Sequence, residues 1–582
     1  MLLRSVKAAN GRHAYLRLVE NFRQGGKTRQ RVILHIGRKD LLAPHLDALV
    51  RLLPADSPDP VWVSSDQVSA PQSWTWGPLL VARHLFDSLS LSALLDEAAP
   101  ASRHRQPLSE RVFPLVANRL TRPGSEHALA GWLEDFYVVT ARGQRWMPEW
   151  RQSRRVKVSF EQLRLWYETL DELLAQKARL EVAVWQQLRD LFSVEPELVF
   201  YDITSTYFEG QGPAELGRFG YSRDGKPRHR QIVVGVVMME GWPIAHHVFA
   251  GNRLDQTTVA EVVQDLRQRF GLGRVVFVGD RGMVTLKNME HLREEGQGYL
   301  VGLQRRNRKD VPDYIAQAEA RGAWEECPVG ISAAEQAAPP RTRVCEVPGK
   351  EPVVRVFVVH SEEREQYERG MRELSRERVR KDLEALRLRV EKGELKEAER
   401  IGAAAAKVLA RNHGHRYFGW ELRGKQFHYF EHRVNFAREK ACEGKYVIQT
   451  EEPNLSPVEA VASYKQLNEV ERGFAHLKGL MEVRPVYHHK DDRVRAHVFV
   501  AALALLLDRA LEKKLRAAGS ALSSPAAWQA LETVRCVEMQ IGERTKLCVT
   551  RGSRRAAEVL KILRLTESDP PQPSKRERTP MW

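Results

Sequence analysis

The pattern of apolar and polar positions divides the first third of the chain into two parts. Over the first forty residues, apolar and polar positions alternate around "RQGGKTRQ", which predicts a twisted β-hairpin with a glycine turn. The stretch "RKDLLAPHLDALVRLL" then predicts a helix and "PADSPDP" a linker, so we expect a domain boundary near residue 60. From Trp74 to about Phe192 the apolar positions follow a helical period, which predicts a helical bundle.

The middle of the chain consists of apolar, β-branched runs of strand length, bounded by Gly, Pro and Asn. These runs are "ELVFYDITSTYFEG", "RQIVVGVVMMEGWPIAHHVFAGN" and "GRVVFVGDRGM". The helical phrase "DQTTVAEVVQDLRQRFG" separates the second run from the third. Sequential strands followed by a helix and a further strand predict an α/β sheet with a crossover connection.

The second half of the chain predicts a large insertion followed by buried helices. We expect short mixed strands from about Asp310 to His360, and a charged, projecting helical hairpin over residues 361–411, because Glu, Arg and Lys dominate there. Strand-like alternation returns in "HRYFGWELRGKQFHYFEH" and "KYVIQT". The apolar stretch from Val494 to Leu515 predicts a core helix, and "ESDPPQPSKRERTP" predicts a disordered tail.

One stretch between these parts, "YKQLNEVERGFAHLK", carries polar residues at a spacing of seven: Tyr464, Glu471 and Lys478. Seven residues advance roughly 700° around an α-helix, about 20° short of two turns, so the three side chains share one face. Ser456 before Pro457 predicts the start of this helix, and Gly479 predicts its end. A second stripe is apolar and can pack on a core: Val470, Phe474 and Leu477. Taken alone, the polar face is typical of a solvated surface with a weak ion pair.

The composition narrows the class of protein. Of the 582 residues, 91 are Lys or Arg and 75 are Asp or Glu, and the net charge of +16 favours a polyanionic partner such as nucleic acid. The five cysteines form no CxxC pair, which predicts free thiols in a reducing compartment. The longest apolar stretch, Val498 to Leu507, is too short to span a bilayer, and no signal peptide is evident. We therefore expect a soluble intracellular protein.

Two aspartates stand where apolar strands give way to polar residues. Asp202 lies in "LVFYDITS" and Asp280 follows "VVFVG". Ligands collect at the carboxyl ends of strands in α/β sheets, so these carboxylates and Glu471, on a helix packed across the sheet, can converge. Three carboxylates repel one another unless divalent cations neutralise them, and oxygen donors suit Mg²⁺ or Mn²⁺. The alternative for each single Asp is an ordinary turn cap.

The order strand Asp, strand Asp, helix Glu resembles the ribonuclease-H-like DDE transposases of bacterial insertion sequences. More narrowly, "YKQLNEVERGFAHLK" resembles the Tyr-x2-Arg-x3-Glu-x6-Lys signature of the transposases that keep a long insertion before the catalytic Glu. Asp280 follows Asp202 by 78 residues (280 − 202), and Glu471 follows Asp280 by 191 (471 − 280), which leaves room for the insertion. Further phrases are similar to the family: "YDITSTYFEG", "FGYSRDGKP", "FAGNRLDQTT", "VGDRGM" and "VANRLTRPGSEHAL".

The resemblance implies a metal-dependent DNA transposase that cleaves the ends of its element and joins the 3′ hydroxyl to target DNA. The implied fold class is α/β, a ribonuclease-H-like core interrupted by a β-rich and helical insertion, with N-terminal basic β-ribbon and helical DNA-binding regions. The carboxylates Asp202, Asp280 and Glu471 would be catalytic and bind two Mg²⁺ or Mn²⁺ ions. The implied partners are transposon-end and target duplex DNA and a second protomer, in the bacterial cytoplasm, with no membrane.

Further DNA contacts are expected outside the three carboxylates. Phosphates would be held by these side chains: Tyr464, Lys478, Arg472, Arg23, Lys27, Arg29 and Arg31. Two tryptophans of the insertion, Trp324 and Trp420, are candidates for stacking on an extruded base, although an arbitrary Trp more often belongs to a core.

The expected regions follow the changes of pattern. They are a basic β-ribbon and helix (1–60), a helical DNA-binding or dimer region (61–195), the first part of the core (196–305), the insertion (306–440), the second part of the core (441–520), and a C-terminal helical region with a disordered tail (521–582).

The chain departs from the family signature at one position, where Leu467 replaces the Arg. Either one phosphate contact is missing or is supplied elsewhere, or this Leu packs the helix down. A structure-specific nuclease and a catalytically retired DNA-binding protein remain alternatives.

No nucleotide cofactor is expected, since no Gly-rich stretch has the spacing of a phosphate loop. The His pairs, among them His246 with His247 and His488 with His489, do not predict a zinc or copper site, because they lack a third ligand at recognisable spacing.

Overall fold

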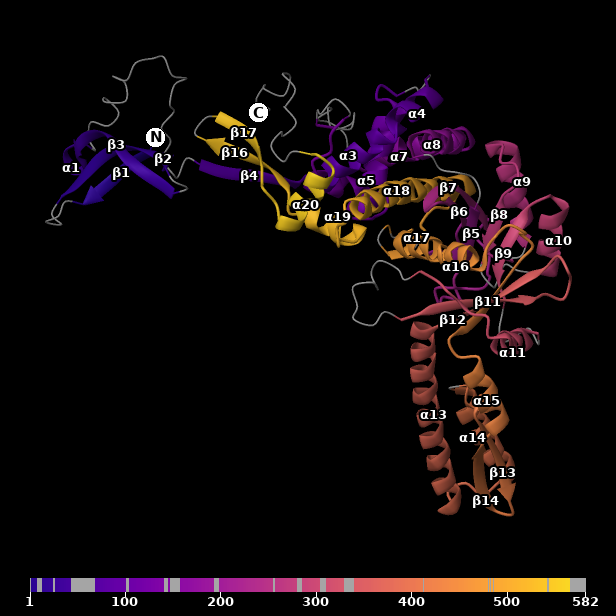
Figure 1. The fold of residues 1–582 in the computed structure, drawn as a ribbon. Coiled ribbons are helices and arrows are strands. Elements are labelled where there is room, and N and C mark those ends of the chain that lie inside the picture. Colours follow the sequence, from indigo (N-terminus) through magenta and orange to yellow (C-terminus); the bar gives the residue numbers. More distant parts are fainter. Residues whose placement is uncertain are drawn as a thin grey trace. The chain divides into compact units, whose positions relative to one another are not determined.

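The computed structural model of the chain (Figure 1) describes most of the sequence, with gaps. The described residues are 2–7, 13–24, 27–42, 68–100, 104–140, 145–146, 158–192, 198–254, 257–279, 285–303, 310–328, 340–411, 413–479, 481, 483–484, 486–541 and 544–565. They form two compact units, Met1–Ala70 with Met539–Lys546, and Pro71–Glu538 with Leu547–Trp582. The finer division into six regions stays a prediction.

The first unit contains a three-stranded antiparallel sheet in the order β1-β2-β3. Its elements are β1 (Leu2–Lys7), β2 (Ala14–Gln24), β3 (Lys27–Arg38) and the short helix α1 (Lys39–Leu42). The predicted hairpin is thereby confirmed as β2 and β3, with β1 as an additional strand. The rest of the helix predicted after Leu42 and the linker "PADSPDP" lie outside the described residues.

The helical region predicted between Trp74 and Phe192 is confirmed. Its helices are α3 (Gly77–Ser88), α4 (Leu91–Ala98), α5 (Leu108–Thr121), α6 (Leu129–Asp135), α7 (Val158–Ala175) and α8 (Lys177–Phe192). No single helix among the described residues is long and apolar enough to cross a membrane, although α3 and α4, which meet at a bend of 64°, reach that length and apolarity together. The helix α5 is buried along almost its whole length, because it packs between α3, α4, α7 and the long helix α18 (Asp491–Ala517).

The second unit is organised around a mixed sheet of nine strands in the order β10-β11-β12-β15-β9-β8-β5-β6-β7. The strands of its first part are β5 (Leu198–Tyr207), β6 (Gln231–Met239), β7 (Trp242–Ala250), β8 (Val276–Gly279) and β9 (Gly298–Gly302). The first three are antiparallel, whereas β8 runs parallel to β5 and β9 parallel to β8. The predicted α/β sheet with a helical crossover is therefore confirmed, with α9 (Val259–Phe270) as the crossover helix.

Both faces of this sheet are covered, which explains why β6 is buried at every position and apolar after Gln231. The helices α16 (Pro457–Lys465), α17 (Leu467–Gly479) and α18 pack on one face. On the other side lie α9 and α10 (Leu286–Glu294), as Figure 1 shows.

The insertion extends the same sheet beyond β9. It adds β10 (Glu325–Glu326), β11 (Thr342–Pro348) and β12 (Arg355–Ser361), and β15 (Lys445–Thr450) joins β12 to β9. The short strands expected between Asp310 and His360 are confirmed, but the helix α11 (Val311–Arg321) also lies there and was not predicted. The apolar positions Val311, Tyr314 and Ile315 of α11 are buried, and Gly322 ends the helix with a φ of 62°.

The charged helical hairpin is confirmed as α13 (Glu362–Glu391) and α14 (Ala398–Arg411). Together with the hairpin of β13 (Phe418–Arg423) and β14 (Gln426–Glu431) and with α15 (Arg433–Ala441), it extends away from the sheet in Figure 1. Buried apolar residues, among them Val379, Leu383 and Phe418, give this extension a hydrophobic cluster of its own.

The C-terminal region differs from the prediction of helices alone. Besides α19 (Ser524–Leu531) and α20 (Arg554–Ile562), it contains β16 (Arg535–Ile541) and β17 (Arg544–Val549), which form a sheet in the order β17-β16-β4 with β4 (Val68–Thr75). The predicted core helix is confirmed as α18. The predicted disordered tail lies outside the described residues.

Candidate active site and nucleic-acid interface

Asp202 lies within β5 and not at its end, because the strand continues to Tyr207. Its side chain is half-buried, and Oδ1 accepts a hydrogen bond of 2.7 Å from the backbone N–H of Ile203. Asp202 and Phe200 point to the same face of the sheet, and Phe200 is paired with Met238, whose sulfur lies on the α17 side near Gly473. Asp202 therefore faces the layer of helices to which α17 belongs.

The strand β8 leads toward the second predicted carboxylate. It pairs with β5 through Leu198 opposite Val276 and Phe200 opposite Val278, an offset of 78 residues (276 − 198). The same number separates Asp202 from Asp280 in the sequence. Asp280 itself lies outside the described residues, which end on this strand at Gly279.

Glu471 lies on α17, and its side chain is exposed. The predicted start of this segment is confirmed: Ser456 forms a capping box with Glu459, and Pro457 begins α16. The prediction of one continuous helix is wrong at Gln466, where α16 ends before α17 begins at Leu467. The packing stripe is confirmed, since all three of its residues are buried: Val470, Phe474 and Leu477.

A groove of about 460 Å³ runs beside Glu471. It is lined by Ser361, Arg364, Tyr446, Tyr464, Lys465, Leu467, Asn468 and Glu471. The rings of Tyr446 and Tyr464 have centroids 5.9 Å apart, and the Arg364 guanidinium lies 5.4 Å from the centre of the Tyr446 ring. Tyr464 and Glu471 thus share a surface as predicted, and the groove combines two aromatic rings with two cations, a set suited to a nucleic acid strand.

Lys478 lies outside this groove. Its Nζ donates a 2.8 Å hydrogen bond to Oδ1 of Asp224, which also pairs with Arg484. Burial lowers the pKa of Lys478, and the hydrogen bond to Asp224 opposes this change. Asp224 belongs to the loop between β5 and β6, so Lys478 connects that loop to the end of α17.

The anchoring of α17 uses most of its other polar residues. Arg472, predicted to bind DNA, is 44% exposed and pairs with Glu469 and with Glu512 of α18. His476 Nδ1 lies 2.6 Å from Asp508 of α18. Because Asp508 also accepts a hydrogen bond from the Trp528 indole, α17, α18 and α19 are linked behind Glu471.

Leu467, at the signature position for Arg, is 4% exposed and belongs to the main hydrophobic core. Of the two explanations offered by the sequence, packing is the one that the structure supports for this side chain. The groove also receives cations from elsewhere, because Arg364 comes from the first turn of α13 and Lys465 from the end of α16.

The two tryptophans predicted to stack on bases are both half-buried against hydrophobic clusters. Trp324 packs edge-on against His360 beneath the Arg343 guanidinium, and Trp420 stacks on Phe427 with centroids 5.9 Å apart. The base-stacking role of either residue stays a prediction.

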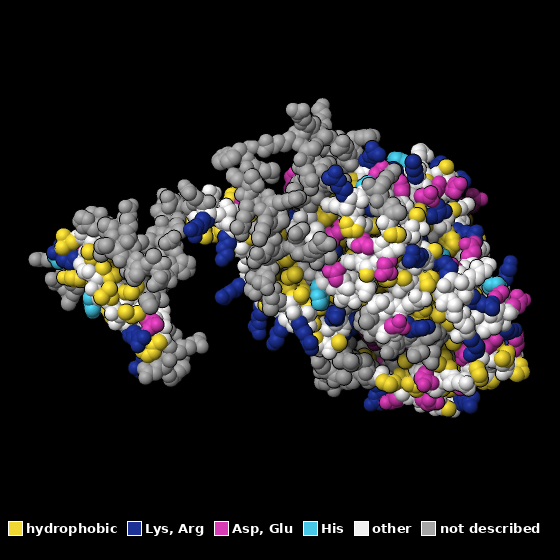
Figure 2. All heavy atoms as spheres, turned by 90° about the horizontal axis from the view of Figure 1, so that it is seen from above, with side chains coloured by type: hydrophobic (Ala, Val, Ile, Leu, Met, Phe, Trp, Pro, Cys, Tyr) yellow, Lys and Arg dark blue, Asp and Glu magenta, His cyan; other side chains and the backbone are white. Residues whose placement is uncertain are grey.

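The basic residues of the N-terminal sheet are described in part. Arg29 is exposed on β3, and Arg31 is exposed while it pairs with Glu20 and lies 6.0 Å from the centre of the Phe22 ring. Arg23 and Lys27 belong to β2 and β3, and their side chains lie outside the described part. In Figure 2, Lys and Arg side chains on the visible face of the large unit are interspersed with Asp and Glu. The charge pattern of that face alone therefore does not locate a DNA site.

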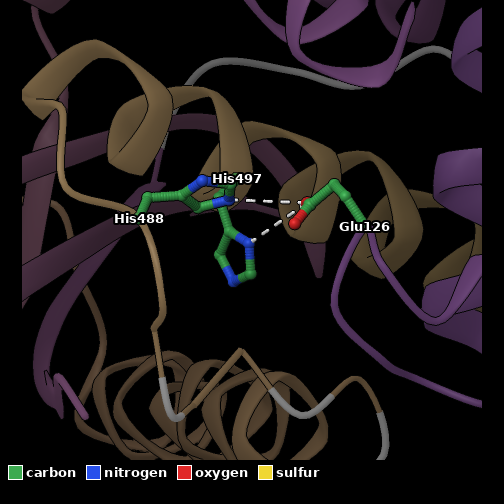
Figure 3. Close-up of side chains that lie close together, drawn as sticks. All are labelled: Glu126, His488 and His497. Carbon is green, nitrogen blue, oxygen red and sulfur yellow. Dashed lines mark ion pairs between the residues drawn. The ribbon is translucent and has the colours of Figure 1, made fainter. Parts of the chain in front are cut away.

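Sequence spacing missed a buried cluster of Glu126, His488 and His497, drawn in Figure 3. His488 lies just before α18 and His497 lies in its first part, whereas Glu126 lies between α5 and α6. The carboxylate is therefore far from the two histidines in the sequence. The donor atoms lie within 4.8 Å of one another. However, Nη2 of Arg119 is 3.3 Å from Nδ1 of His497 and 4.0 Å from Glu126, and this fixed cation disfavours a metal ion there. The cluster is better explained as a buried polar connection between the helical region and α18.

Comparison with known proteins identifies the family. The family model "Transposase DDE domain" matches residues 195–507, more than half of the chain, and the model "IS1634 family transposase, N-terminal domain" matches residues 3–59. No curated protein matches. A solved structure, the cryo-EM structure of a piggyBac transposase synaptic complex with hairpin DNA, is similar at 10% identity and a TM-score of 0.32, over 78% of this chain and 79% of that chain, a similarity too weak to support an argument. The chain belongs to the DDE transposases of IS1634-type insertion sequences and is a DNA transposase.

Proposed function

We propose that Asp202, Asp280 and Glu471 are the catalytic carboxylates of this transposase, in a core of the ribonuclease-H-like type. They would cleave DNA at the ends of the element and join the 3′ hydroxyl to target DNA. The core is supported by the arrangement of its strands, an antiparallel meander of β5, β6 and β7 extended by the parallel strands β8 and β9.

The observation that carries this proposal is the register of the parallel strands. If the offset of 78 residues between β5 and β8 continues past the last described pair, it would bring position 280 opposite Asp202. Side chains at paired positions of neighbouring strands point to the same face. Since Asp202 faces the α17 layer and α17 packs on β5, Glu471 of α17 can complete the set.

The donor set fits a hard divalent cation. Carboxylate oxygens are the preferred ligands of Mg²⁺ and Mn²⁺, and Asp202, Asp280 and Glu471 would hold them. Two such ions, when bound, supply activation of an attacking oxygen and stabilisation of the leaving oxygen in phosphoryl displacement. The number and the identity of the ions belong to the proposal.

Cationic and aromatic side chains outside the carboxylate set would hold the DNA. Tyr464, Arg364 and Lys465 in the groove would bind phosphates beside Glu471, and the exposed Arg29 and Arg31 of the N-terminal sheet would contact the element's ends. The +16 charge supports a polyanionic partner. Because an element has two ends, we propose a homodimer as the active form.

The test uses a labelled duplex that carries an end of the element encoding the chain, with Mg²⁺ or Mn²⁺. We expect site-specific nicking and joining by the wild type and loss of both in Glu471→Gln. The matched control is Glu399→Gln, an exposed carboxylate of α14, which should keep full activity. Equal activity of Glu471→Gln would contradict the assignment of this residue. Nicking without joining, under conditions where the ends are paired, would favour a nuclease.

A further inference from the structure

The loop between β5 and β6 carries an unusual density of cations and exposed aromatic rings. Its segment "RFGYSRDGKPRHR", residues 218–230, contains five Lys or Arg residues and one Asp. The Asp is already neutralised, because Asp224 pairs with Lys478 and Arg484. Two aromatic side chains of the loop are largely exposed, Phe219 at 60% and Tyr221 at 80%.

This loop is held in place beside the proposed catalytic strand. The backbone N–H of Arg223 donates a 2.9 Å hydrogen bond to Oγ of Ser205, three residues after Asp202 on β5. Gly220 packs so closely on the end of β7 that a Cβ there would lie 1.9 Å from the carbonyl oxygen of Gly251. The two exposed rings therefore stand on either side of a fixed glycine.

A cation lies near each exposed ring. The guanidinium of Arg223 is 5.8 Å from the centre of the Tyr221 ring, and that of Arg230 is 5.8 Å from the centre of the Phe219 ring. Aromatic rings interleaved with cations on a positively charged surface are the features that bind single-stranded nucleic acid, with the rings stacking on bases and the cations near phosphates. In a duplex the base faces are stacked on one another, so rings that bind by stacking select an unpaired strand.

We propose that residues 218–230 form a binding site for unpaired DNA next to the catalytic carboxylates, in which Tyr221 and Phe219 stack on bases and Lys226 and Arg228 contact phosphates. This site deepens the proposed function and rests on it, because the unpaired strand would come from the transposon end that the proposed carboxylates cleave. It assigns base stacking to residues other than Trp324 and Trp420, which are half-buried.

The probe is a 20-nucleotide single-stranded DNA with a central 2-aminopurine, mixed with the full-length chain in EDTA so that no cleavage occurs. We expect the wild type to quench the 2-aminopurine fluorescence by stacking. Tyr221→Ala and Phe219→Ala should each weaken binding about tenfold and reduce the quenching. Tyr221→Phe should retain both. The matched control is Tyr367→Ala, since Tyr367 of α13 is also exposed, at 68%, and should bind as the wild type does.

A second measurement follows the phosphates. The double variant Lys226→Ala, Arg228→Ala should lower the slope of log K against log salt concentration by about 1.4, because each single-strand phosphate contact contributes about 0.7. Unchanged quenching in the Tyr221→Ala, Phe219→Ala double variant, or equal loss in Tyr367→Ala, would overturn the site. These readouts do not depend on catalysis: stacking that persists while Glu471→Gln still cleaves would reject the catalytic assignment and leave this site intact.

Discussion

The hydroxyl oxygen of Tyr464 lies against the backbone of Gly302, where a Cβ atom would be only 2.1 Å from it. Gly302 is the last residue of β9, and the register of β8 with β9 pairs Gly279 with Val301, the residue before it. The tyrosine is therefore held at the end of the strand next to the one that leads to Asp280. We infer that this contact sets the distance of Tyr464 from the proposed carboxylates.

A methyl group at position 302 should displace this tyrosine. Gly302→Ala is expected to lower DNA cleavage about ten- to a hundredfold, because small misplacements of groups at a reacting centre have effects of this size. Gly131→Ala is the control, since nothing lies within 4 Å of a Cβ at that helical position. Cleavage rates of the two variants on the same end substrate decide the matter, and equal rates would show that the position of Tyr464 is unimportant.

Arg364 should contribute to DNA binding from within the insertion. It lines the groove with Glu471 and pairs with Glu368 on its own helix. We expect Arg364→Ala to raise the KM for the end duplex about tenfold and to flatten its salt dependence, because one phosphate contact is lost.

The control for Arg364 is Arg400→Ala, which removes a helical Arg paired with Glu397 and exposed at 71%. Steady-state cleavage at three salt concentrations measures both effects. If the two variants behave alike, the groove does not bind the substrate.

Leu467 should act through packing. Its side chain is buried in the main core, so Leu467→Ala is expected to lower the free energy of unfolding by about 2–4 kcal/mol, whereas Leu467→Met should cost less than about 1.5 kcal/mol. Leu467→Arg would bury a charge and should destabilise the chain without restoring a phosphate contact. Denaturant unfolding gives these values. A stable and more active Leu467→Arg would show that this position faces the DNA.

The parts of the fold that follow from local patterns could be predicted from the sequence. The β-branched runs became β5 to β8, and Ser456 with Pro457 marked the start of α16 because capping chemistry acts over three or four residues. The candidate carboxylates could also be named from the sequence, since a strand Asp and a helix Glu need no partner to be noticed, and their catalytic role stays a prediction. The spacing of 78 residues between Asp202 and Asp280 can be counted in the sequence. Only the structure shows that β5 and β8 pair with the same offset.

The missed features depend on partners far away in the chain. Asp224 could not be recognised as the partner of Lys478, 254 residues later, and Glu126 could not be paired with His488. The break at Gln466 has no Gly or Pro to mark it. The helix α11 did carry a local signal, an apolar stripe that ends at Gly322, and it was obscured by the strand-like residues around it.

The pair of Asp224 and Lys478 should support both stability and the adjoining loop. Asp224→Asn removes the counter-charge of two cations while Lys478 stays largely buried, so we expect the free energy of unfolding to fall by about 3 kcal/mol. The control is Asp492→Asn, whose carboxylate is 79% exposed beside Arg495 and should matter by less than about 1 kcal/mol. Urea titrations of both variants test this, and a loss as small as the control's would mean that the pair is solvated.

Stability should decrease as the pH falls from about 6.5, because several histidines are buried in the neutral form. Burial lowers the pKa of His246 to about 4, from a usual value of 6.5, and His247 and His497 are shifted to the same value. Between these two pH values the unfolded chain binds a proton at each site that the folded chain does not bind. Each histidine therefore reduces the free energy of unfolding by up to about 1.4 kcal/mol per pH unit in this window.

His246 allows this contribution to be isolated. Its Nδ1 lies 2.9 Å from Glu181, and its ring stacks on Phe499. Lys177 and His246 outweigh burial and lower the pKa of Glu181, so that carboxylate acts below pH 4.5, outside the range from pH 6.5 to 5. We expect His246→Gln to unfold more easily at pH 7.5 and to show a shallower loss of stability between pH 6.5 and 5. His489→Gln, at an exposed position, should keep the wild-type slope. An equal slope in all three proteins would mean that His246 becomes protonated in the folded chain, and that its contact with Glu181 is then an ion pair.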